Sequence, residues 1–405
     1  MGPGRPVRIA CKPEAVVVTC GDGDEAIYAF DHAGRLFTAW LRGRLFRRAL
    51  DGRIMEKRTD RSDRRPVRHR RFLTPDEGAG LLDASAAAAG EAMAALHSGR
   101  AELLWSIPGP EDRAWAAALL EAAARFDARA AEVDSARFAE AYTPVAILPP
   151  DRYRSLVIQV TEGCHWNRCT FCTFYRDRRF RIKTDAEFAA HVDAVARFFG
   201  PGLSLRRGIF LGDANALFLP VEILLPRLDL LARRLARHAT DLAAFIDVFT
   251  GHRRAASDFA ALGARGLRRI YVGLESGDDE TLVFLNKPQT AAQATDLVLT
   301  AKQAGLGVGI IVMAGVGGRQ RWRRHVEATV ATLGAMRLGA GDLVYVSAFT
   351  APHDGPYAQR ARADGTEPLT PDEVEDQVDE LLKGAARVTA PGIRAARYDI
   401  EEFLY

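Results

Sequence analysis

The sequence is short of cysteine, and the few cysteines that it has are unevenly placed. There are five in 405 residues, and none follows Cys172. Three of them, Cys164, Cys169 and Cys172, lie within nine residues. An odd number clustered in this way excludes a framework of paired disulfides. It favours a metal or redox site in a reducing compartment.

The sequence also lacks an uninterrupted apolar run close to the roughly 20 residues that a membrane-spanning helix requires. Residues 1–12 carry no apolar segment after a basic start, so no secretory signal is expected. These two features predict a cytoplasmic protein without a membrane span. Because 48% of the residues are apolar, the chain can bury one large core or two smaller ones.

Acidic residues are scarce in one part of the chain. The net charge is only +3, yet residues 35–71 hold fourteen Lys and Arg against four Asp and Glu. Such a run is usually a solvated basic face; alternatively, it contacts nucleic acid, a phosphorylated substrate or an acidic redox partner. Because it lacks regularly spaced aromatic residues, it does not predict a base-stacking platform. The run leaves the function open.

Local patterns divide the chain into four regions with different expected structures. The first combines short strand patterns with turns, and the second is rich in alanine at helical spacing. The third alternates strands with helices, and the fourth is a C-terminal helical extension. The expected boundaries are residues 1–72, 73–150, 151–350 and 351–405.

The first two regions predict a small antiparallel sheet followed by about three helices. A basic segment over residues 60–71 contains a proline and indicates a connector. A Thr-Pro-Asp-Glu signal at residues 74–77 begins the first helix, and the same signal recurs at residues 370–373. The expected strands lie at residues 15–20, 25–30, 36–41 and 54–57.

The third region carries six short apolar runs with helical patterns between them. Runs that do not alternate in polarity are typical of strands buried on both faces, which predicts a parallel sheet covered by helices. In such a sheet, open or curved into a barrel, ligands bind at the carboxyl ends of the strands. The expected strands are residues 156–160, 208–211, 245–249, 270–274, 309–313 and 343–346.

The clustered cysteines lie on a loop directly after the first of these strands. A structural zinc site needs four protein ligands, and His165 is poorly placed to be the fourth because it is adjacent to Cys164. An iron–sulfur cubane is usually held by four thiolates, so three leave one iron open to a substrate or cofactor. The spacing therefore favours a [4Fe-4S] cluster on Cys164, Cys169 and Cys172, with zinc as the alternative.

A three-cysteine loop after the first strand of a sixfold βα series resembles the radical S-adenosylmethionine (SAM) enzymes. The resemblance covers residues 152–350 and implies an α/β fold with a partial (β/α)6 barrel of the TIM type. Phe171, before the last cysteine, matches an aromatic residue that packs near the SAM adenine in the family. The commonest family spacing is Cys-x3-Cys-x2-Cys, whereas this chain has four residues in the first gap, as some members do.

Two later motifs strengthen the resemblance. Gly212-Asp213 lies where the family has Gly-Gly-Glu, which implies contact with the methionyl amino group of SAM. Residues 270–277 resemble a segment of oxygen-independent coproporphyrinogen oxidase and of the tRNA methylthiotransferases. That likeness implies that Glu275 and Ser276 contact SAM.

Two further positions match the family downstream. Lys287 corresponds to a basic residue that would pair with the SAM carboxylate, although Pro288 follows it where the family often has glycine. Residues 310–318, with Gly315 among them, resemble the fifth-strand motif, whose glycines let the backbone approach the adenine.

The resemblance implies a chemistry as well as a fold. In the family, a reduced [4Fe-4S] cluster gives one electron to SAM at the open iron, and the resulting 5′-deoxyadenosyl radical abstracts hydrogen from the substrate. The implied cofactors are the cluster and SAM, and the implied electron donor is a flavodoxin or a ferredoxin. Because no cysteine follows Cys172, a second cluster is not expected. An Asp-x-His-x-x-Gly signature is missing, which disfavours cobalamin.

The substrate is not identified by the sequence. A small metabolite or natural-product intermediate is the leading interpretation, and modification of RNA or protein is the alternative. The non-enzyme alternative is an interaction protein stabilised by an iron–sulfur cluster or by zinc. Arginines 176, 178, 179 and 181 follow the loop and could meet an anionic group or form an exposed basic loop. One of these arginines, Arg178, is a candidate substrate-side residue. Four others are candidates because they lie near strand ends: Tyr153, His252, Tyr345 and His353.

Overall fold

The computed structural model describes residues 7–21, 26–60, 67–105 and 112–405. The chain divides into two compact units. Unit 1 comprises Met1–Pro144, Asp193–Arg207 and Leu404–Tyr405, and unit 2 comprises Val145–Val192 and Gly208–Phe403. The helices that follow the N-terminal sheet therefore belong to the same unit as that sheet. The finer division into four regions stays a prediction.

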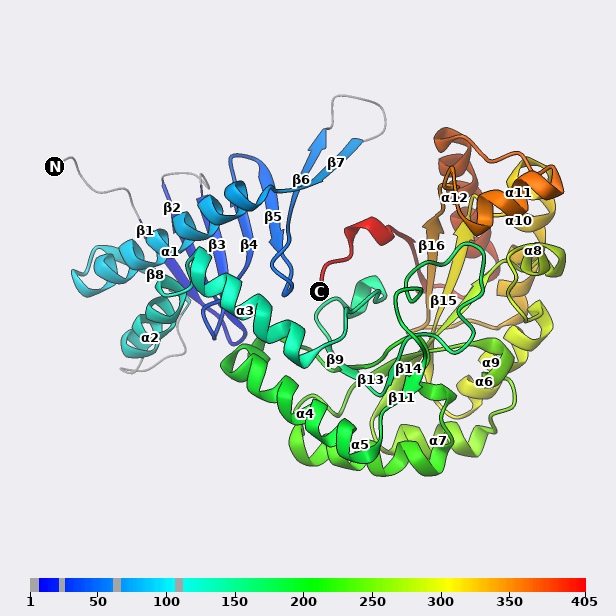
Figure 1. The fold of residues 1–405 in the computed structure, drawn as a ribbon, viewed down its shortest axis with the longest axis horizontal. Helices are drawn as coiled ribbons and strands as arrows, with labels where there is room; N and C mark the ends of the chain where they lie inside the picture. The colour runs from blue at the N-terminus through cyan, green and yellow to red at the C-terminus, as the bar shows by residue number, and fades with distance from the viewer. Residues whose placement is uncertain (1–6, 22–25, 61–66, 106–111) are drawn as a thin grey trace. The chain divides into compact units, whose positions relative to one another are not determined.

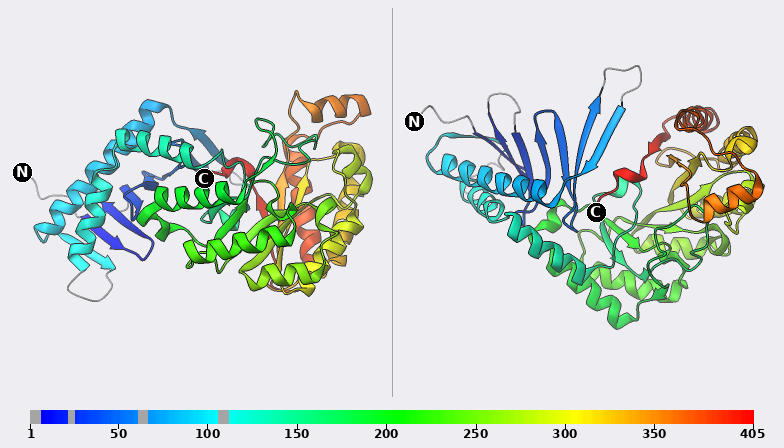
Figure 2. Two further views of the ribbon diagram at one scale, coloured as in Figure 1. Left: turned by 60° about the horizontal axis from the view of Figure 1, so that its bottom comes forward. Right: turned by 45° about the horizontal axis from the view of Figure 1, so that its top comes forward.

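Unit 1 is built on an eight-stranded sheet in the order β7-β6-β5-β4-β3-β2-β1-β8. Neighbouring strands are antiparallel except β1 and β8, which are parallel. Helix α1 packs on the sheet, as the two views of Figure 2 show. The elements are β1 (Val7–Cys11), β2 (Ala15–Cys20), β3 (Ala26–Asp31), β4 (Leu36–Leu41), β5 (Arg44–Arg48), β6 (Ile54–Asp60), β7 (Val67–Phe72), α1 (Pro75–His97), β8 (Ala101–Trp105), α2 (Asp112–Ala124) and α3 (Ala128–Ala141).

Small side chains allow α1 to lie close to the sheet. Ala89 and Ala92 are fully buried in one core with Val16 and Phe30, and a helix face of alanines brings the backbones close together. The helix begins at a capping box: Thr74 Oγ1 accepts from the N–H of Glu77 at 3.3 Å, and the Glu77 carboxylate accepts from the N–H of Thr74 at 2.9 Å. The predicted antiparallel sheet and the predicted start of this helix are confirmed.

The predicted connector over residues 60–71 is wrong where the structure describes it. Val67–Phe72 forms strand β7 and pairs with β6, whereas residues 61–66 lie outside the described part of the chain. β7 is an edge strand of the sheet, and edge strands commonly carry charged side chains. The arginines of β7 therefore made this strand resemble a polar connector in the sequence. Strand β8 was not predicted.

The basic run over residues 35–71 does not form one surface. Arg35 and Arg48 are buried and share the carboxylate of Asp134, with N–O distances of 2.7 and 3.2 Å. These two cations stabilise the interior of unit 1. Six other residues of β5, β6 and β7 line a hollow of about 260 Å³: Arg44, Glu56, Arg58, His69, Arg70 and Arg71.

Unit 2 contains a seven-stranded parallel sheet in the order β17-β16-β15-β14-β13-β12-β9. Helices α7 and α9 pack on β14, and α12 packs on β15, β16 and β17; Figure 1 shows the sheet with its surrounding helices. The predicted parallel sheet covered by helices is confirmed. The strands are β9 (Leu156–Gln159), β12 (Ile209–Gly212), β13 (Leu242–Ile246), β14 (Leu267–Glu275), β15 (Gly307–Ala314), β16 (Leu343–Ala348) and β17 (Arg394–Tyr398).

The connections between these strands are mostly helical. After the first strand, two short antiparallel strands flank the cysteine loop, and a helix follows them. The remaining crossovers carry one or two helices each. The two short strands are β10 (Thr161–Glu162) and β11 (Arg181–Ile182), and the helices are α4 (Asp185–Phe199), α5 (Val221–Arg234), α6 (Val248–Gly251), α7 (Ala256–Ala264), α8 (Asp279–Phe284), α9 (Ala291–Gln303), α10 (Gly318–Ala335), α11 (Pro356–Asp364) and α12 (Pro371–Val388). Among the described residues, no helix is long and apolar enough to cross a membrane.

Five of the six predicted strands overlap closely with the observed ones, and one was misplaced. Residues 245–249 were expected to be a strand, but β13 ends at Ile246 and α6 begins at Val248. Asp247 causes this change, because its carboxylate accepts the N–H of Thr250 at 2.7 Å and so caps α6. Strand β17, at the edge of the sheet, was not predicted.

Candidate active site

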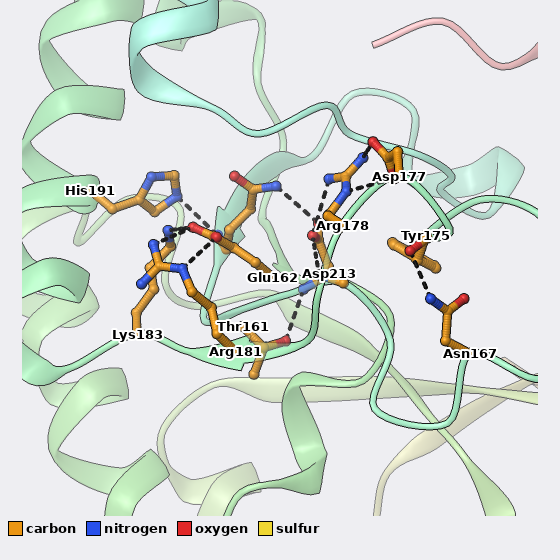
Figure 3. A network of polar contacts seen from close by, with 12 residues as sticks. Thr161, Glu162, Asn167, Tyr175, Asp177, Arg178, Arg181, Lys183, His191 and Asp213 are labelled. Atoms are coloured by element: carbon orange, nitrogen blue, oxygen red, sulfur yellow. Dashed lines mark hydrogen bonds and ion pairs between the residues drawn. The ribbon is translucent and has the colours of Figure 1, made fainter.

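The cysteine loop follows β9 and β10, at the carboxyl end of the first parallel strand. Asn167, inside the longer gap, has a φ of +47°, a conformation that asparagine tolerates better than most residues. Its N–H lies 3.3 Å from Cys164 Sγ, and its side-chain amide donates to the Tyr175 carbonyl at 2.8 Å (Figure 3). Asn167 therefore turns the loop back toward its first cysteine.

Other side chains brace the loop through its backbone. The Arg176 guanidinium donates to the carbonyls of Cys169 and Cys172, both at 3.0 Å. Asn286 donates to the Arg168 carbonyl at 2.9 Å, and the Asn286 carbonyl accepts from the Trp166 indole at 3.0 Å. These bonds hold the loop backbone and leave the thiols free to bind a metal centre. Hydrogen bonds of this kind commonly orient the ligands of metal sites. Arg176 is thus a brace of the loop.

The three thiols share an electrostatic neighbourhood with Glu275 and Lys287. Burial raises the pKa of Cys169 to about 12; Lys287 opposes this rise, and the other two thiols and Glu275 add to it. Burial likewise raises the pKa of Cys172. Thiols in this setting stay protonated and are poor nucleophiles, whereas a bound cationic centre displaces their protons.

This donor set fits an iron–sulfur cluster. Clustered cysteine sulfurs suit iron–sulfur ligation, and three of them leave one iron without a protein ligand. The thiols stand on a braced loop at the carboxyl edge of a parallel sheet, where ligands bind. In the described part of the chain, no three His, Cys, Asp or Glu side chains lie close enough together to hold a single metal ion.

Glu275 and Lys287 form a buried ion pair beside the thiols. Glu275 ends β14 with a φ of +59°, and its carboxylate accepts from Lys287 Nζ at 2.5 Å. Their side chains are only 9% and 10% exposed. Burial lowers the pKa of Lys287, but Glu275 and Cys169 raise it more. The structure thus brings together two residues predicted to contact SAM, and their roles toward SAM stay predictions.

Gly273 leaves space for this pair in its observed position. A Cβ on Gly273 would lie 2.3 Å from Glu275 Oε1 and 2.7 Å from Lys287 Nζ, closer than real side chains approach. The Gly273 carbonyl also accepts from Lys287 at 2.8 Å and from the Gln289 amide at 3.0 Å. The glycine in the predicted motif therefore makes room for a charge pair.

Ser276 is engaged within the protein. Its side chain is fully buried, and its hydroxyl lies 2.8 Å from His325 Nδ1, while His325 Nε2 lies 2.9 Å from the Met313 carbonyl. Because a carbonyl only accepts, Nε2 carries the proton and Nδ1 accepts from the serine hydroxyl. Ser276 Oγ in turn accepts from the N–H of Asp278 at 3.0 Å. This chain joins β14, α10 and β15, and contact of Ser276 with SAM stays a prediction.

The His325 network predicts a specific dependence of stability on pH. Burial lowers the pKa of His325 to about 4, whereas an unfolded histidine titrates near 6.5. Between these values the unfolded chain binds a proton that the folded chain does not. Stability from this group is therefore present above pH 6.5 and is lost as pH falls toward 4. Relative to a variant without the imidazole, the wild type should lose about 2 kcal/mol between pH 6.5 and 5.

His325→Gln tests this expectation. The difference in free energy of unfolding between wild type and variant should shrink as pH falls through this range, because only the wild type must protonate a buried imidazole. Denaturant unfolding at several pH values measures the difference. His97→Gln, at the exposed end of α1, is the matched control and should show a constant difference. A constant difference for His325→Gln would contradict the neutral, buried imidazole.

Asp213 follows β12 and organises the backbone that precedes Cys164. Its carboxylate accepts from the Gln159 amide at 2.9 Å and from the N–H of Gly163 at 3.0 Å, and Arg178 faces it at 3.5 Å (Figure 3). Burial raises the pKa of Asp213 to about 6, while these three partners lower it. The Gly212 carbonyl accepts from the N–H of Val160 at 2.8 Å. Contact of the Gly212-Asp213 pair with the SAM amino group stays a prediction.

The predicted arginines after the loop are largely engaged. Arg178 donates to Asp177 at 2.9 Å as well as facing Asp213. Arg181 donates to both oxygens of Glu162, at 2.6 and 2.8 Å, and thereby ties β10 to β11; Figure 3 shows both groups. Arg179 has an exposed side chain. Arg176 and Arg181 are exposed as well, but their guanidinium groups are hydrogen-bonded to the loop backbone and to Glu162. Most of this basic segment therefore stabilises the loop region.

Two residues, Phe171 in the cysteine loop and Gly315 after β15, were predicted to lie near the adenine. Phe171 is half-buried and packs against an apolar cluster that contains Phe284, Met313 and Tyr357. Gly315 has a φ of +91°, and a Cβ there would lie 2.2 Å from the Phe349 carbonyl oxygen. Backbone packing thus requires glycine at position 315. Its approach to the adenine stays a prediction.

The structure separates the candidate substrate-side residues. Tyr345 donates to Asp151 at 2.9 Å, and Asp151 precedes β9, so this hydroxyl faces the amino ends of the strands and not the cysteine loop. His252 Nδ1 lies 2.9 Å from the Val248 carbonyl within the turn of α6. Tyr153 packs on Phe403 with ring centroids 5.5 Å apart. His353 is exposed. No common substrate site forms from these residues.

A different group of polar residues surrounds the loop and was not predicted. His165, Asn215 and Asp247 follow β10, β12 and β13, and Asp247 Oδ2 lies 3.6 Å from His165 Nε2. Burial lowers the pKa of His165, while Asp247 opposes this. The sequence does contain a signal for this group, because polar residues directly after buried strands often line a site. Asp247 was missed because the strand predicted over residues 245–249 placed it inside a strand and not after one.

Comparison with protein families identifies the class of the molecule. Residues 158–329 match the model of the Radical SAM superfamily, and this stretch holds the cysteine loop, Glu275 and Lys287. This part of the chain is therefore similar to the radical SAM domain. The family uses a [4Fe-4S] cluster and SAM, as the sequence predicted. No curated protein sequence matches the chain.

Solved structures of radical SAM proteins are among its structural relatives. Coproporphyrinogen III oxidase (HemN) from Escherichia coli is 15% identical over 58% of this chain and 52% of its own, with a TM-score of 0.43. The radical SAM methyltransferase TsrM from Kitasatospora setae is 16% identical over 63% of this chain and 58% of its own, with a TM-score of 0.41. The chain thus spans between half and three fifths of these relatives.

Proposed function

We propose that Cys164, Cys169 and Cys172 bind a [4Fe-4S] cluster, and that the protein uses it to cleave SAM reductively and abstract hydrogen from a small-molecule substrate. The observation that carries the proposal is the set of three half-buried thiols on one braced loop. When bound, the cluster supplies the electron that converts SAM into methionine and a 5′-deoxyadenosyl radical. The subfamily is left open.

The chain's own residues orient and shield this centre. Arg176 and Asn286 fix the loop backbone, and Asn167 directs an N–H toward Cys164 Sγ at 3.3 Å, a contact that stabilises a thiolate. The Lys287 ammonium lies close enough to Cys169 to lower the thiol pKa, so it favours the ligating form. Glu275 holds that lysine in place at 2.5 Å. Half-buried phenylalanines that pack against His165 of the loop, Phe180, Phe218 and Phe249, would limit the access of water to a reactive centre.

The proposed reaction also requires an electron donor. Radical SAM enzymes need a reductant, and a flavodoxin or ferredoxin is the proposed donor. A cytoplasmic location also stays a prediction.

Formation of 5′-deoxyadenosine tests the proposal. The protein is purified without oxygen, reconstituted with iron and sulfide, and mixed with dithionite and SAM. The expected result is 5′-deoxyadenosine, measured by chromatography, that requires both the reductant and the reconstituted cluster. SAM that stays intact over a fully loaded, reduced cluster would contradict the proposal.

A further inference from the structure

Three polar side chains converge at the carboxyl ends of adjacent strands, next to the cysteine loop. His165 follows Cys164 directly, Asn215 lies just beyond β12, and Asp247 follows β13. The strands β9, β12 and β13 are neighbours in the sheet, and ligands of parallel sheets bind at this edge. Asp247 also raises the pKa of Lys287, the lysine that acts on Cys169. The group therefore belongs to the surroundings of the cluster loop.

Buried polar atoms of this group lack hydrogen-bond partners. Asn215 is only 4% exposed, and its Oδ1 has no partner among the described residues. Its amide nitrogen is used, since it donates to the Asp247 carboxylate and lies 3.4 Å from Thr250 Oγ1. Both ring nitrogens of His165 are buried and likewise unpaired in the described chain, with Nε2 3.6 Å from Asp247 Oδ2. Buried unpaired polar atoms are costly and commonly mark a ligand site.

The Asp247 carboxylate is largely withdrawn from solvent, and its ion-pair contact among the described residues is with His165 Nε2, at 3.6 Å. The Asp247 side chain is 13% exposed, and its hydrogen-bond donors are neutral: the Asn215 amide, and the N–H and hydroxyl of Thr250 at 2.7 to 2.8 Å. Among the described residues, no lysine or arginine pairs with it. Lys287 is committed to Glu275 and to the Gly273 carbonyl. A buried carboxylate normally has a cationic partner, so this one can accept a cation.

Aromatic rings enclose the same place. The His165 ring stacks on Phe218 at a centroid distance of 4.5 Å, with Phe249 at 5.4 Å and Phe180 at 5.8 Å. Trp166 lies 5.8 Å from Phe249. Aromatic faces attract organic cations, and together with a carboxylate they recognise ammonium groups.

We propose that Asp247, Asn215 and His165 form a subsite for a primary ammonium group on the substrate. An ammonium group has three N–H donors, which match one oxygen of Asp247, the free Asn215 Oδ1 and one His165 nitrogen. Both oxygens of Asp247 already accept from Thr250 or Asn215, so a bidentate guanidinium matches the site less well than a single N–H donor does. The subsite rests on the proposed function, because it would hold an amine substrate next to the centre that generates the radical.

Binding of a matched pair of probes tests the subsite. Butylammonium and its neutral counterpart butanol are titrated into the reconstituted, oxidised full-length protein and followed by saturation-transfer NMR. Butylammonium should bind at least tenfold more tightly than butanol. Asp247→Asn should weaken butylammonium at least tenfold, and asparagine still caps a helix well, so α6 should persist. Glu327→Gln, at a carboxylate whose side chain is 67% exposed, is the control and should leave binding unchanged.

The outcomes separate this inference from the proposed function. Equal binding of the two probes, or unchanged butylammonium binding to Asp247→Asn, would overturn the subsite. Saturating SAM should leave butylammonium bound; displacement by SAM would assign the place to SAM's own amino group and would also overturn the inference. Whether the protein cleaves SAM is measured separately as 5′-deoxyadenosine, so a failure there is recognised independently.

Discussion

Replacing Cys164, Cys169 or Cys172 with alanine is expected to abolish both the visible absorption of the reconstituted cluster and the formation of 5′-deoxyadenosine. In the proposed site each thiol is one of three ligands, and a cubane that keeps only two protein thiolates has two irons without a protein ligand. The loss should be complete for each variant, because the two cysteines outside the loop, Cys11 and Cys20, lie within strands β1 and β2 of the other sheet. Anaerobic iron and sulfide analysis, absorption spectra and product chromatography measure the effect.

Cys20→Ala is the matched control for these three variants. Cys20 lies on strand β2 of the other unit and is half-buried, like the loop cysteines. It should retain a normal content of iron and sulfide and normal product formation. A loop variant that keeps a stoichiometric cluster would show that its thiol is not a ligand.

Lys287→Met is expected to cause the largest loss of stability among single substitutions around the site. It leaves the Glu275 carboxylate buried without its cation, which costs about 3–5 kcal/mol for a broken buried pair. For a unit of this size, such a loss lowers the midpoint of thermal unfolding by roughly 10 °C. Cluster content should also fall, because Lys287 is the cation that lowers the pKa of Cys169. Anaerobic thermal unfolding and iron analysis measure the two effects.

A double variant separates the charge from the loss of side-chain volume. Adding Glu275→Gln to Lys287→Met removes the unpaired charge, so much of the lost stability should return. Arg323→Ala breaks an ion pair with Glu327 on α10, where the arginine is 90% exposed, and should change the midpoint little. If Lys287→Met behaved like Arg323→Ala, the pair would not be a buried, stabilising contact.

The parallel sheet was predictable because its strands are buried on both faces. All four residues of β9 and of β12 are buried, so apolar runs marked these strands without any knowledge of their partners. Two other strands, both at sheet edges, carry no such mark. β7 and β17 are rich in arginine and are held by backbone pairing with one neighbour each, which local sequence does not encode.

The cysteine loop was predictable for a different reason: ligand spacing is a local property. Partners that are distant in the chain are not. The sequence does not show that Ser276 would bond to His325, or that Asp213 would accept from Gly163. Likewise, the turn that makes Asp247 a helix cap and brings it near His165 depends on the register between β12 and β13. Tertiary packing decided these roles.

The most direct test of the central claim is electron paramagnetic resonance of the reduced cluster with and without SAM. If three cysteines leave one iron open, SAM binds that iron and changes the g values of the spectrum. This change is expected in the wild type, together with four irons and four sulfides per chain. A fully reduced cluster whose spectrum is the same with saturating SAM would contradict the central claim.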